Sequence, residues 1–236
     1  MCTVSFVNNN GKTIMTSNRD EKIVRETAIE PKNYSINNKN ILFPKDPKAG
    51  GTWFAVDING TVLILLNGAK EKHIVESKYR KSRGIVVLDL ISSQSPKDFW
   101  LEIELNNIEP FTIVLFQNEK LFQLRWNAFE KETLELNTNE CHIWSSSTLY
   151  SKEIREMRSK WFFDFLKHKP SVSDSEMIDF HQNTENNNPK NGLVINRNNE
   201  LKTVSISQVI LERNKVKMKY LDLLSDKNYK NTFIVI

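Results

Sequence analysis

The sequence has few of the residues on which disulfide frameworks, metal sites and nucleotide-binding loops depend. It contains two cysteines, Cys2 and Cys141, four histidines and seven glycines in 236 residues. Two cysteines cannot build a disulfide framework, and no HxxxH or HExxH spacing is present, so we expect neither a stapled secreted domain nor a metal site. Gly50-Gly51 is isolated, which argues against a glycine-rich phosphate loop, and no Gly-x-Ser-x-Gly frame indicates a serine hydrolase.

Long apolar runs and an excess of one charge are also missing. The longest strongly apolar run, residues 62–66, is too short to span a membrane, and no basic region followed by an apolar stretch indicates a signal peptide. The net charge is +4 with basic and acidic residues interspersed, which does not favour nucleic acid as a partner. We therefore expect a cytoplasmic protein that takes a small-molecule substrate or ligand. Nothing in the sequence indicates an oligomeric state.

What the composition does support is one ordinary folded domain. Hydrophobic residues make up 39% of the chain and charged residues 26%, as in typical globular proteins. No linker rich in proline, glycine or serine, no internal repeat and no change of composition divides the chain. We expect a single domain over residues 1–236.

Short apolar segments between turn residues predict a protein built mainly of strands. The turn Asn8–Gly11 predicts a hairpin from strands at 3–7 and 12–16, and Asn59-Gly60 predicts a second from residues 49–57 and 61–66. Further strands are predicted at 111–117, 121–126, 132–136, 142–145, 204–212, 216–221 and 232–236.

Helices are fewer, and they follow in pairs between groups of strands. Helical spacing of apolar residues, or a helix-start signal, predicts helices at 84–92, 96–103, 151–167 and 173–180. The polar, proline-interrupted segment 182–191 is predicted to be a mobile loop. This order of elements favours antiparallel sheets covered by helices, an α+β class.

The most informative position is Cys2, directly behind the initiator methionine. Removal of Met1 would leave one residue with both a thiol and a free α-amine. Their ordinary pKa values are about 8.5 and about 7.7–8.0, so the amine can accept the thiol proton near neutral pH. The alternative is that Cys2 is a small buried hydrophobe at the start of a strand.

The first hairpin is expected to bring two charged residues close to Cys2. Its second strand ends at Asn18-Arg19-Asp20, and in an antiparallel hairpin this end lies beside the start of the first strand. A carboxylate there could hold the α-ammonium group, and an arginine would lower the pKa of the thiol. The alternative is a polar loop whose charges are solvated.

The second hairpin predicts an amide donor. Asn67 stands at the end of its second strand, and a buried asparagine amide could donate to a developing oxyanion. The alternative is that Asn67-Gly68 is only the turn that ends the strand. Trp53, which follows two glycines, is expected near the same strand, either in the core or in a pocket wall.

Together these pieces resemble the NRDE family, which is also named after the transport and Golgi organisation protein 2. The resemblance extends along most of the chain and is strongest over residues 1–127. It rests on Met1-Cys2-Thr3, Ser17-Asn18-Arg19-Asp20-Glu21, Gly50-Gly51-Thr52-Trp53, Leu66-Asn67, Ser82-Arg83-Gly84 and Pro110-Phe111-Thr112. The family is similar to the N-terminal nucleophile hydrolases, whose choloylglycine hydrolase branch also begins Met-Cys.

The resemblance implies a four-layer αββα sandwich of antiparallel sheets and a hydrolase of amide or thioester bonds. Cys2 would attack the carbonyl carbon, Asp20 would fix the α-amine, and Asn67 would help to form the oxyanion hole. Arg19 would bias the thiolate or bind an acidic group of the substrate. The remaining contacts to the substrate would come from Asn18, Trp53 and Ser146.

Two departures from the family pattern support a rival function. Ser146 stands where the family usually has asparagine, and Val204 stands where it usually has arginine. The rival is a non-catalytic protein of the same fold that binds or carries haem, acyl-CoA or lipid. No cofactor is expected for the hydrolase; haem would be a ligand of the rival, with His73 as the candidate for its axial contact.

Overall fold

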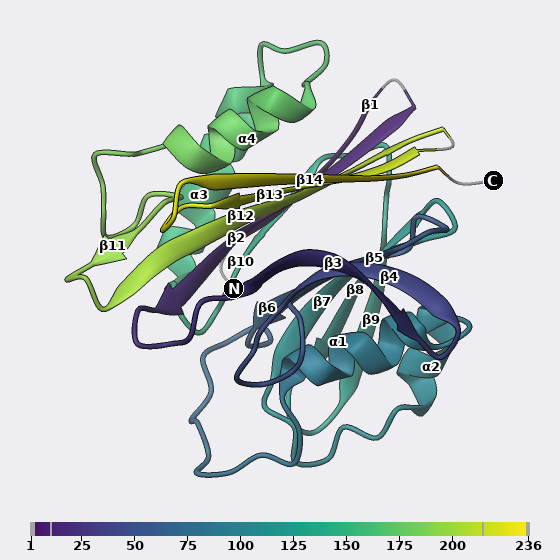
Figure 1. The fold of residues 1–236 in the computed structure, drawn as a ribbon. Coiled ribbons are helices and arrows are strands. Elements are labelled where there is room, and N and C mark those ends of the chain that lie inside the picture. Colours follow the sequence, from purple (N-terminus) through teal and green to yellow (C-terminus); the bar gives the residue numbers. More distant parts are fainter. Residues whose placement is uncertain (1–2, 10, 214, 235–236) are drawn as a thin grey trace. The chain divides into compact units, whose positions relative to one another are not determined.

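The computed structural model describes residues 3–9, 11–213 and 215–234, and the chain groups into two compact units. Unit 1 combines Met1–Arg25 with Asn139–Ile236, and unit 2 is the continuous segment Glu26–Thr138. Among the described residues, each unit holds one seven-stranded antiparallel sheet and two helices (Figure 1). The expected α+β class is confirmed.

In unit 1 the two strands of the N-terminal hairpin lie inside the sheet. The strand order is β10-β1-β2-β12-β13-β14, and β11 pairs with β12. The elements are β1 (Thr3–Asn9), β2 (Lys12–Lys22), β10 (His142–Ser145), α3 (Lys152–Leu166), α4 (Asp174–Asn183), β11 (Asn196–Arg197), β12 (Leu201–Glu212), β13 (Lys215–Asp222) and β14 (Lys227–Ile234).

In unit 2 the strands follow one another in chain order, β3 to β9. The elements are β3 (Ile29–Ile36), β4 (Lys39–Lys45), β5 (Phe54–Asp57), β6 (Val62–Asn67), α1 (Arg83–Ser92), α2 (Pro96–Glu102), β7 (Phe111–Gln117), β8 (Lys120–Trp126) and β9 (Lys131–Leu136). The Asn59-Gly60 hairpin joins β5 to β6 as expected, with Gly60 at φ 78°.

The helices α3 and α4 cover one face of the unit 1 sheet. Side chains alternate along a strand, so Thr3, Ser5 and Val7 of β1 share a face. Val7 belongs to an apolar cluster with residues of both helices, of β2 and β12 and of the loops before and after α4, namely Ile14, Phe162, Val172, Met177, Phe180, Leu193 and Ile210. The polar residues of the same face, Thr3 and Ser5, continue this face toward the start of β1.

The sequence explains why three of the helices, α1, α2 and α4, begin where they do. α4 starts at a capping box, in which the Ser173 hydroxyl accepts from the Glu176 N–H and the Glu176 carboxylate accepts from the Ser173 N–H. α2 starts with Pro96 at its first position, and α1 is capped by the Ser82 hydroxyl. The first residues of these three helices agree with the predicted first residues to within one position.

A hairpin in unit 2 was absent from the predicted elements. β3 and β4 are joined by Asn37 and Asn38 at φ 49° and 61°, the two positive angles that a type I′ turn requires. β3 is an edge strand that contains Pro31 at a register shift, and most of its residues are half-buried or exposed. Its apolar pattern is therefore too weak to predict a strand.

Several predicted boundaries were wrong. The strand predicted from residue 49 begins at Phe54, and those predicted from 204 and 232 begin at Leu201 and Lys227. β2 continues to Lys22, so the segment from Ser17 to Glu21 is strand rather than the end of one. α4 continues to Asn183, three residues beyond the predicted end. The rest of the predicted loop forms turns closed by backbone hydrogen bonds, such as Gly192 N–H to the Asn188 carbonyl at 2.8 Å.

Two glycines of unit 2 form a close backbone crossing. A Cβ on Gly51 would lie 2.3 Å from the carbonyl carbon of Gly84, and a Cβ on Gly84 would lie 2.9 Å from the Thr52 carbonyl oxygen. The Thr52 N–H donates to the Gly84 carbonyl at 3.1 Å across this crossing. The motifs that contain Gly51 and Gly84, 33 residues apart in the sequence, are in direct contact, because the loop before β5 packs on the start of α1.

No helix among the described residues has the length and apolar character needed to cross a membrane.

The crossing predicts a selective loss of stability. Gly51→Ala should lower the free energy of unfolding by about 1–3 kcal/mol or more, because the added methyl group meets backbone atoms that cannot rotate away. Gly11→Asn is the control, since φ there is +71°, which asparagine tolerates, and nothing lies within 4 Å of an added Cβ. Denaturant titration measures both, and equal losses would contradict the packing argument.

Candidate functional site

The candidate site is described from Thr3 onward, because Cys2 lies outside the described residues. Thr3 pairs with Asn18 of β2 and with Ser145 of β10, so the start of β1 lies between two strands. The expectation that the end of β2 comes beside the start of β1 is confirmed for Thr3 and Asn18.

Asp20 is a buried carboxylate whose two oxygens are both held by hydroxyl groups. The Tyr150 hydroxyl donates to its Oδ2 at 2.6 Å, and the Thr203 hydroxyl contacts its Oδ1 at 2.5 Å. The Ile195 N–H donates to the Thr203 oxygen at 2.9 Å, which leaves the hydroxyl proton of Thr203 for Asp20. Asp20 is only 3% exposed, so its position is fixed by internal partners.

Arg158 of α3 is a fully buried guanidinium group that fastens three segments to one another. It donates to the Thr3 hydroxyl at 2.5 Å and to the carbonyls of Asn191 and Gly192. Its guanidinium carbon lies 3.6 Å from the ring centroid of Tyr150, within cation–π distance. Since Tyr150 in turn holds Asp20, Arg158 connects the start of β1 to the buried carboxylate.

His181 of α4 is held in one tautomer. The Asn18 amide nitrogen donates to the carbonyls of His181 and Leu193 at 3.0 and 2.8 Å, which identifies its oxygen as the atom next to His181 Nδ1. Nδ1 therefore carries the proton, and Nε2 accepts from the Ser5 hydroxyl at 2.7 Å. The Asn18 side chain, predicted to bind substrate, is fully buried in these contacts.

This histidine is neutral at physiological pH. Burial, and next the positive charge of Arg158, lower the pKa of His181 to about 3. A protonated ring at this position would be a second buried cation with no carboxylate against it among the described residues. The histidine therefore acts as a hydrogen-bonding link between β1, β2 and α4.

Arg19 points to the opposite face of the sheet from Asp20, as alternation along β2 requires. Its side chain is 5% exposed and pairs with the Glu21 carboxylate at 3.3 Å, two residues along on the same face. Glu21 also lies 3.6 Å from Arg25. The adjacent charges Arg19 and Asp20 therefore contact different partners, Arg19 the Glu21 carboxylate and Asp20 the two hydroxyl groups.

The two positions that depart from the family pattern both lie in this region of unit 1. The register between β2 and β12 shifts between Thr203 and Ser205, so Val204 is an extra residue at a bulge beside Asp20 and Arg19. Ser146 follows β10, is buried, and its hydroxyl lies 2.9 Å from that of Thr148. Val204 directly follows Thr203, and the Ser146 carbonyl accepts from the N–H of Tyr150, so both positions adjoin residues that hold the Asp20 carboxylate.

Asn67 and Trp53 belong to unit 2. Asn67 is the last residue of β6, half-buried, and pairs with Phe111 of β7. Trp53 is buried, and its carbonyl accepts from Leu65 of β6 at 2.9 Å, which confirms that it lies beside the strand that ends at Asn67.

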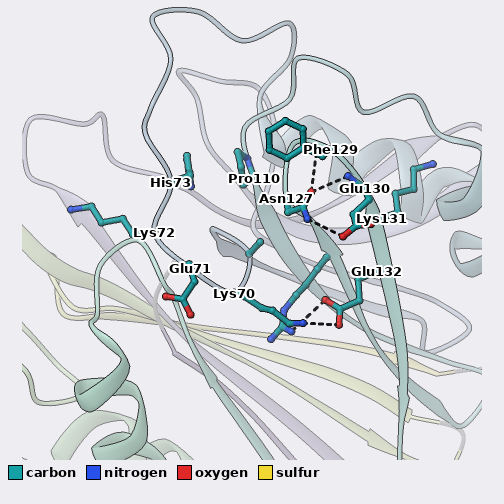
Figure 2. Close-up of a pocket in the computed structure, with 12 residues that line it drawn as sticks. Lys70, Glu71, Lys72, His73, Pro110, Asn127, Phe129, Glu130, Lys131 and Glu132 are labelled. Atoms are coloured by element: carbon teal, nitrogen blue, oxygen red, sulfur yellow. Dashed lines mark hydrogen bonds and ion pairs between the residues drawn. The ribbon is translucent and has the colours of Figure 1, made fainter.

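Unit 2 contains a cavity of about 640 Å³, and the first of its lining residues in the sequence is Ala69, two residues after Asn67 (Figure 2). Its lining combines cationic, anionic and apolar groups, namely Ala69, Lys70, Glu71, Lys72, His73, Pro110, Arg125, Asn127, Phe129, Glu130, Lys131 and Glu132. Glu132 pairs with Lys70 at 3.5 Å and with Arg125 at 3.6 Å. Of the residues predicted for a site, only His73, the candidate axial contact for haem, is among those that line this cavity.

Four side chains that hold the site together were absent from the predicted site: Tyr150, Arg158, His181 and Thr203. The sequence did carry one signal, because Arg158 lies four residues after Ile154 and four before Phe162, within the apolar stripe of α3. A charged residue on a buried helix face needs partners. Those partners are mostly backbone carbonyls of a distant loop, which no side-chain pattern indicates.

The sequence matches the family described as Transport and Golgi organisation 2 over residues 1–220. The chain belongs to this family. Among curated protein sequences, none matches it.

Solved structures extend the comparison to the fold. A cysteine-to-alanine mutant of the conjugated bile acid hydrolase from Clostridium perfringens is 11% identical, with a TM-score of 0.60, over 99% of this chain and 96% of that one. An arginine-to-leucine variant of that hydrolase is 12% identical, with a TM-score of 0.58, over 99% and 97%. A Caenorhabditis elegans orthologue of N-acylethanolamine-hydrolyzing acid amidase is 13% identical, with a TM-score of 0.62, over 88% and 92%. The fold is therefore of the N-terminal nucleophile hydrolase type.

The low pKa of His181 predicts a pH-dependent stability. The unfolded chain binds the proton with a pKa near 6.5 and the folded chain only near 3, so stability is complete above pH 6.5 and falls as the pH drops toward 3. The slope should be about 1.4 kcal/mol per pH unit between these values. His181→Gln, which keeps a donor and an acceptor but does not titrate, should lack this part of the slope. Urea titrations at several pH values give the difference; parallel curves would refute a buried neutral histidine.

Proposed function

We propose that the protein is a cysteine N-terminal nucleophile hydrolase that cleaves an amide or thioester bond. The observation that carries the proposal is Asp20, a buried carboxylate held by Tyr150 and Thr203 in the strand next to the start of β1. Cys2 is bonded to Thr3, whose hydroxyl is held by Arg158. A carboxylate fixed beside a potential N-terminal ammonium group is what this chemistry needs.

The reaction begins after Met1 is removed. The free α-amine of Cys2 takes the thiol proton, and the thiolate attacks the carbonyl carbon of the substrate. The tetrahedral adduct collapses, and the departing amine or thiol leaves with the proton from the α-ammonium group. Water then attacks the acyl-cysteine while the α-amine takes one of its protons. Release of the acid returns that proton to the thiolate.

The other site residues divide the supporting roles. Asp20 orients and stabilises the α-ammonium form of the base, through the position that its two hydroxyl partners impose. Arg19, on the opposite face of the sheet, lowers the pKa of the thiol or receives an acidic group of the substrate. The Asn67 amide donates to the oxyanion. Within unit 1, Ser146 contributes to the wall of the site and Asn18 supports it from within the sheet; Trp53 is assigned to substrate binding by the family resemblance alone.

The comparisons support this reading only through the fold and the names of the relatives. One solved relative is named a conjugated bile acid hydrolase, and its structure is that of a mutant with alanine in place of a cysteine at its second residue. Another is named an acid amidase. Cys2 occupies the corresponding second position in this chain.

A second candidate function is a non-catalytic carrier for acyl-CoA or lipid on the same fold. The observation that favours it is Val204, which occupies the bulge beside Arg19 and Asp20, where the family pattern has an arginine. Ser146 likewise replaces an amide with a hydroxyl. Loss of one oxyanion donor typically costs about 10²–10³ in turnover, so a site that lacks two polar groups would be a slow enzyme or a binding site.

If the carrier bound haem, His73 would have to serve as the axial ligand, and its surroundings do not suit that role. The Nε2 of His73 lies 3.2 Å from the Glu109 carboxylate, and its Nδ1 is buried without a hydrogen-bond partner among the described residues. The His73 ring lines the cavity, but Nε2 is engaged by Glu109 and Nδ1 is buried. The predicted role of His73 as an axial ligand is therefore not supported by its surroundings.

Cys2→Ala is predicted to abolish hydrolysis and leave the fold intact. The assay is a panel of amide, thioester and acyl-CoA substrates, with Cys141→Ala as the matched control that should keep wild-type turnover. Asn67→Ala should lower kcat by about 10²–10³ if its amide stabilises the oxyanion. Turnover that survives Cys2→Ala would remove the nucleophile assignment. Binding of acyl-CoA without turnover in the wild type would favour the carrier.

The two thiols should differ in reactivity. Burial raises the pKa of the Cys141 thiol, and Cys141 packs against the apolar cluster of unit 1. We expect iodoacetamide at pH 7 to label Cys2 faster than Cys141, because only Cys2 gains a neighbouring amine and arginine. Peptide mass spectrometry gives both rates, and intact mass shows whether Met1 is absent. Equal rates, or quantitative retention of Met1, would contradict the self-activating mechanism.

A further inference from the structure

One segment of unit 2 carries the entire net charge of the protein. The segment between β6 and the start of α1, residues 70–83, is here called the basic loop. It contains six lysines or arginines and two glutamates. The whole chain has 33 basic and 29 acidic residues, so the remainder holds 27 of each. The +4 charge of the chain is therefore concentrated in 14 of its residues.

The tip of the basic loop also exposes its apolar residues. Ile74 is 93% exposed and Val75 is 66% exposed, although aliphatic side chains of this size are normally buried. Lys72 and Lys78 stand on either side of them in the chain, both exposed. No ion pair of either lysine is found in the part of the chain that the structure describes. The exposed acids Glu71 and Glu76 also belong to this part of the loop, so the tip presents two apolar groups between two lysines with an acid beside each.

The base of the loop is fastened to unit 2. Arg80 donates to the carbonyls of Glu104 and Asn106 at 2.6 and 3.2 Å, and Lys81 pairs with Asp89 at 2.6 Å. The Glu109 carboxylate bridges Arg83, at 2.9 Å, and His73, at 3.2 Å. These contacts fix where the loop leaves and rejoins unit 2, so its exposed tip has a defined position.

A second exposed apolar group lies at the cavity that the first residues of the basic loop line. Phe129 is 90% exposed and lines the same cavity as Lys72 and His73 (Figure 2). It is held in a tight turn, in which the Asn127 side-chain oxygen accepts from the N–H groups of Phe129 and Glu130, each at 2.9 Å. Ala128 in this turn has φ 83°, a strained angle for a residue with a side chain.

We propose that the basic loop docks unit 2 onto an anionic phospholipid surface. Ile74, Val75 and Phe129 enter the boundary between headgroups and acyl chains, while Lys72 and Lys78 contact the anionic headgroups. A lipid surface is favoured over other polyanions because it can bind both the lysines and the exposed apolar side chains of the tip. A nucleic acid or an acidic protein segment would use the lysines but would gain little from two aliphatic side chains at the tip.

The test is co-sedimentation of the full chain with vesicles of phosphatidylcholine alone or with phosphatidylserine. We expect binding only to the anionic vesicles, weakening as salt rises from 0.1 to 0.5 M. Lys72→Gln with Lys78→Gln should reduce affinity at least tenfold, since a lysine near such a surface contributes about fivefold. Ile74→Ser with Val75→Ser should also reduce it at least tenfold, and should leave the salt dependence unchanged.

Unit 1 offers matched controls for both variants. Ile23-Val24 is the same dipeptide, with Val24 93% exposed, in a segment without net positive charge. Lys160 and Lys167 are two exposed lysines of the α3 region. Ile23→Ser with Val24→Ser, and Lys160→Gln with Lys167→Gln, should change affinity less than twofold. Far-UV circular dichroism verifies that every variant is folded.

Three results would overturn the proposal. The first is a wild-type chain that does not sediment with anionic vesicles. The second is an equal effect of the basic-loop variants and their controls. The third is binding that needs the lysines but not Ile74 and Val75, together with equal loop-dependent retention on heparin, which would identify a general polyanion site instead.

Discussion

The buried guanidinium of Arg158 is the contact on which the candidate site depends. It joins the start of β1, the loop at residues 191–192 and the ring of Tyr150, and through Tyr150 it reaches Asp20. An uncompensated buried charge is costly, so the Thr3 hydroxyl and the two loop carbonyls stabilise the fold by solvating the guanidinium group. Burial, and next this same charge, lower the pKa of His181 and keep it neutral. Removing this one side chain would release several parts of the site together.

The two faces of β2 give adjacent residues different tasks. Asp20 lies on the helix-covered face with Asn18, where side chains are locked to α4, to Tyr150 and to β12. Arg19 lies on the other face with Glu21. A strand can in this way deliver opposite charges within one residue of each other without forming a direct pair. Alternation along the strand supplies this separation without any special backbone geometry.

The sequence predicted those turns and helix starts that depend only on interactions between residues close together in the chain. The hairpins at Asn8–Gly11 and Asn59-Gly60, the Pro96 start of α2 and the capping box at Ser173 all follow from residues within a few positions of each other. The β3–β4 hairpin escaped prediction because an edge strand has little apolar alternation. Arg158 and His181 escaped because their partners are backbone and hydroxyl groups more than 30 residues away in sequence. The placement of Thr3 beside Asn18 needed only the hairpin.

The split of unit 1 into two segments sets an order of assembly during synthesis. Unit 2 is continuous and has all its strand partners once residue 138 has emerged. Asp20 must wait for Thr203, 183 residues later, before its carboxylate is held. At about 5–20 residues per second, this delay is roughly 10–40 s. The N-terminal hairpin lacks β10 until residue 145 has been made and β12 until the end of that interval, so the ribosome-bound chain first exposes two strand edges and then one that chaperones would have to shield.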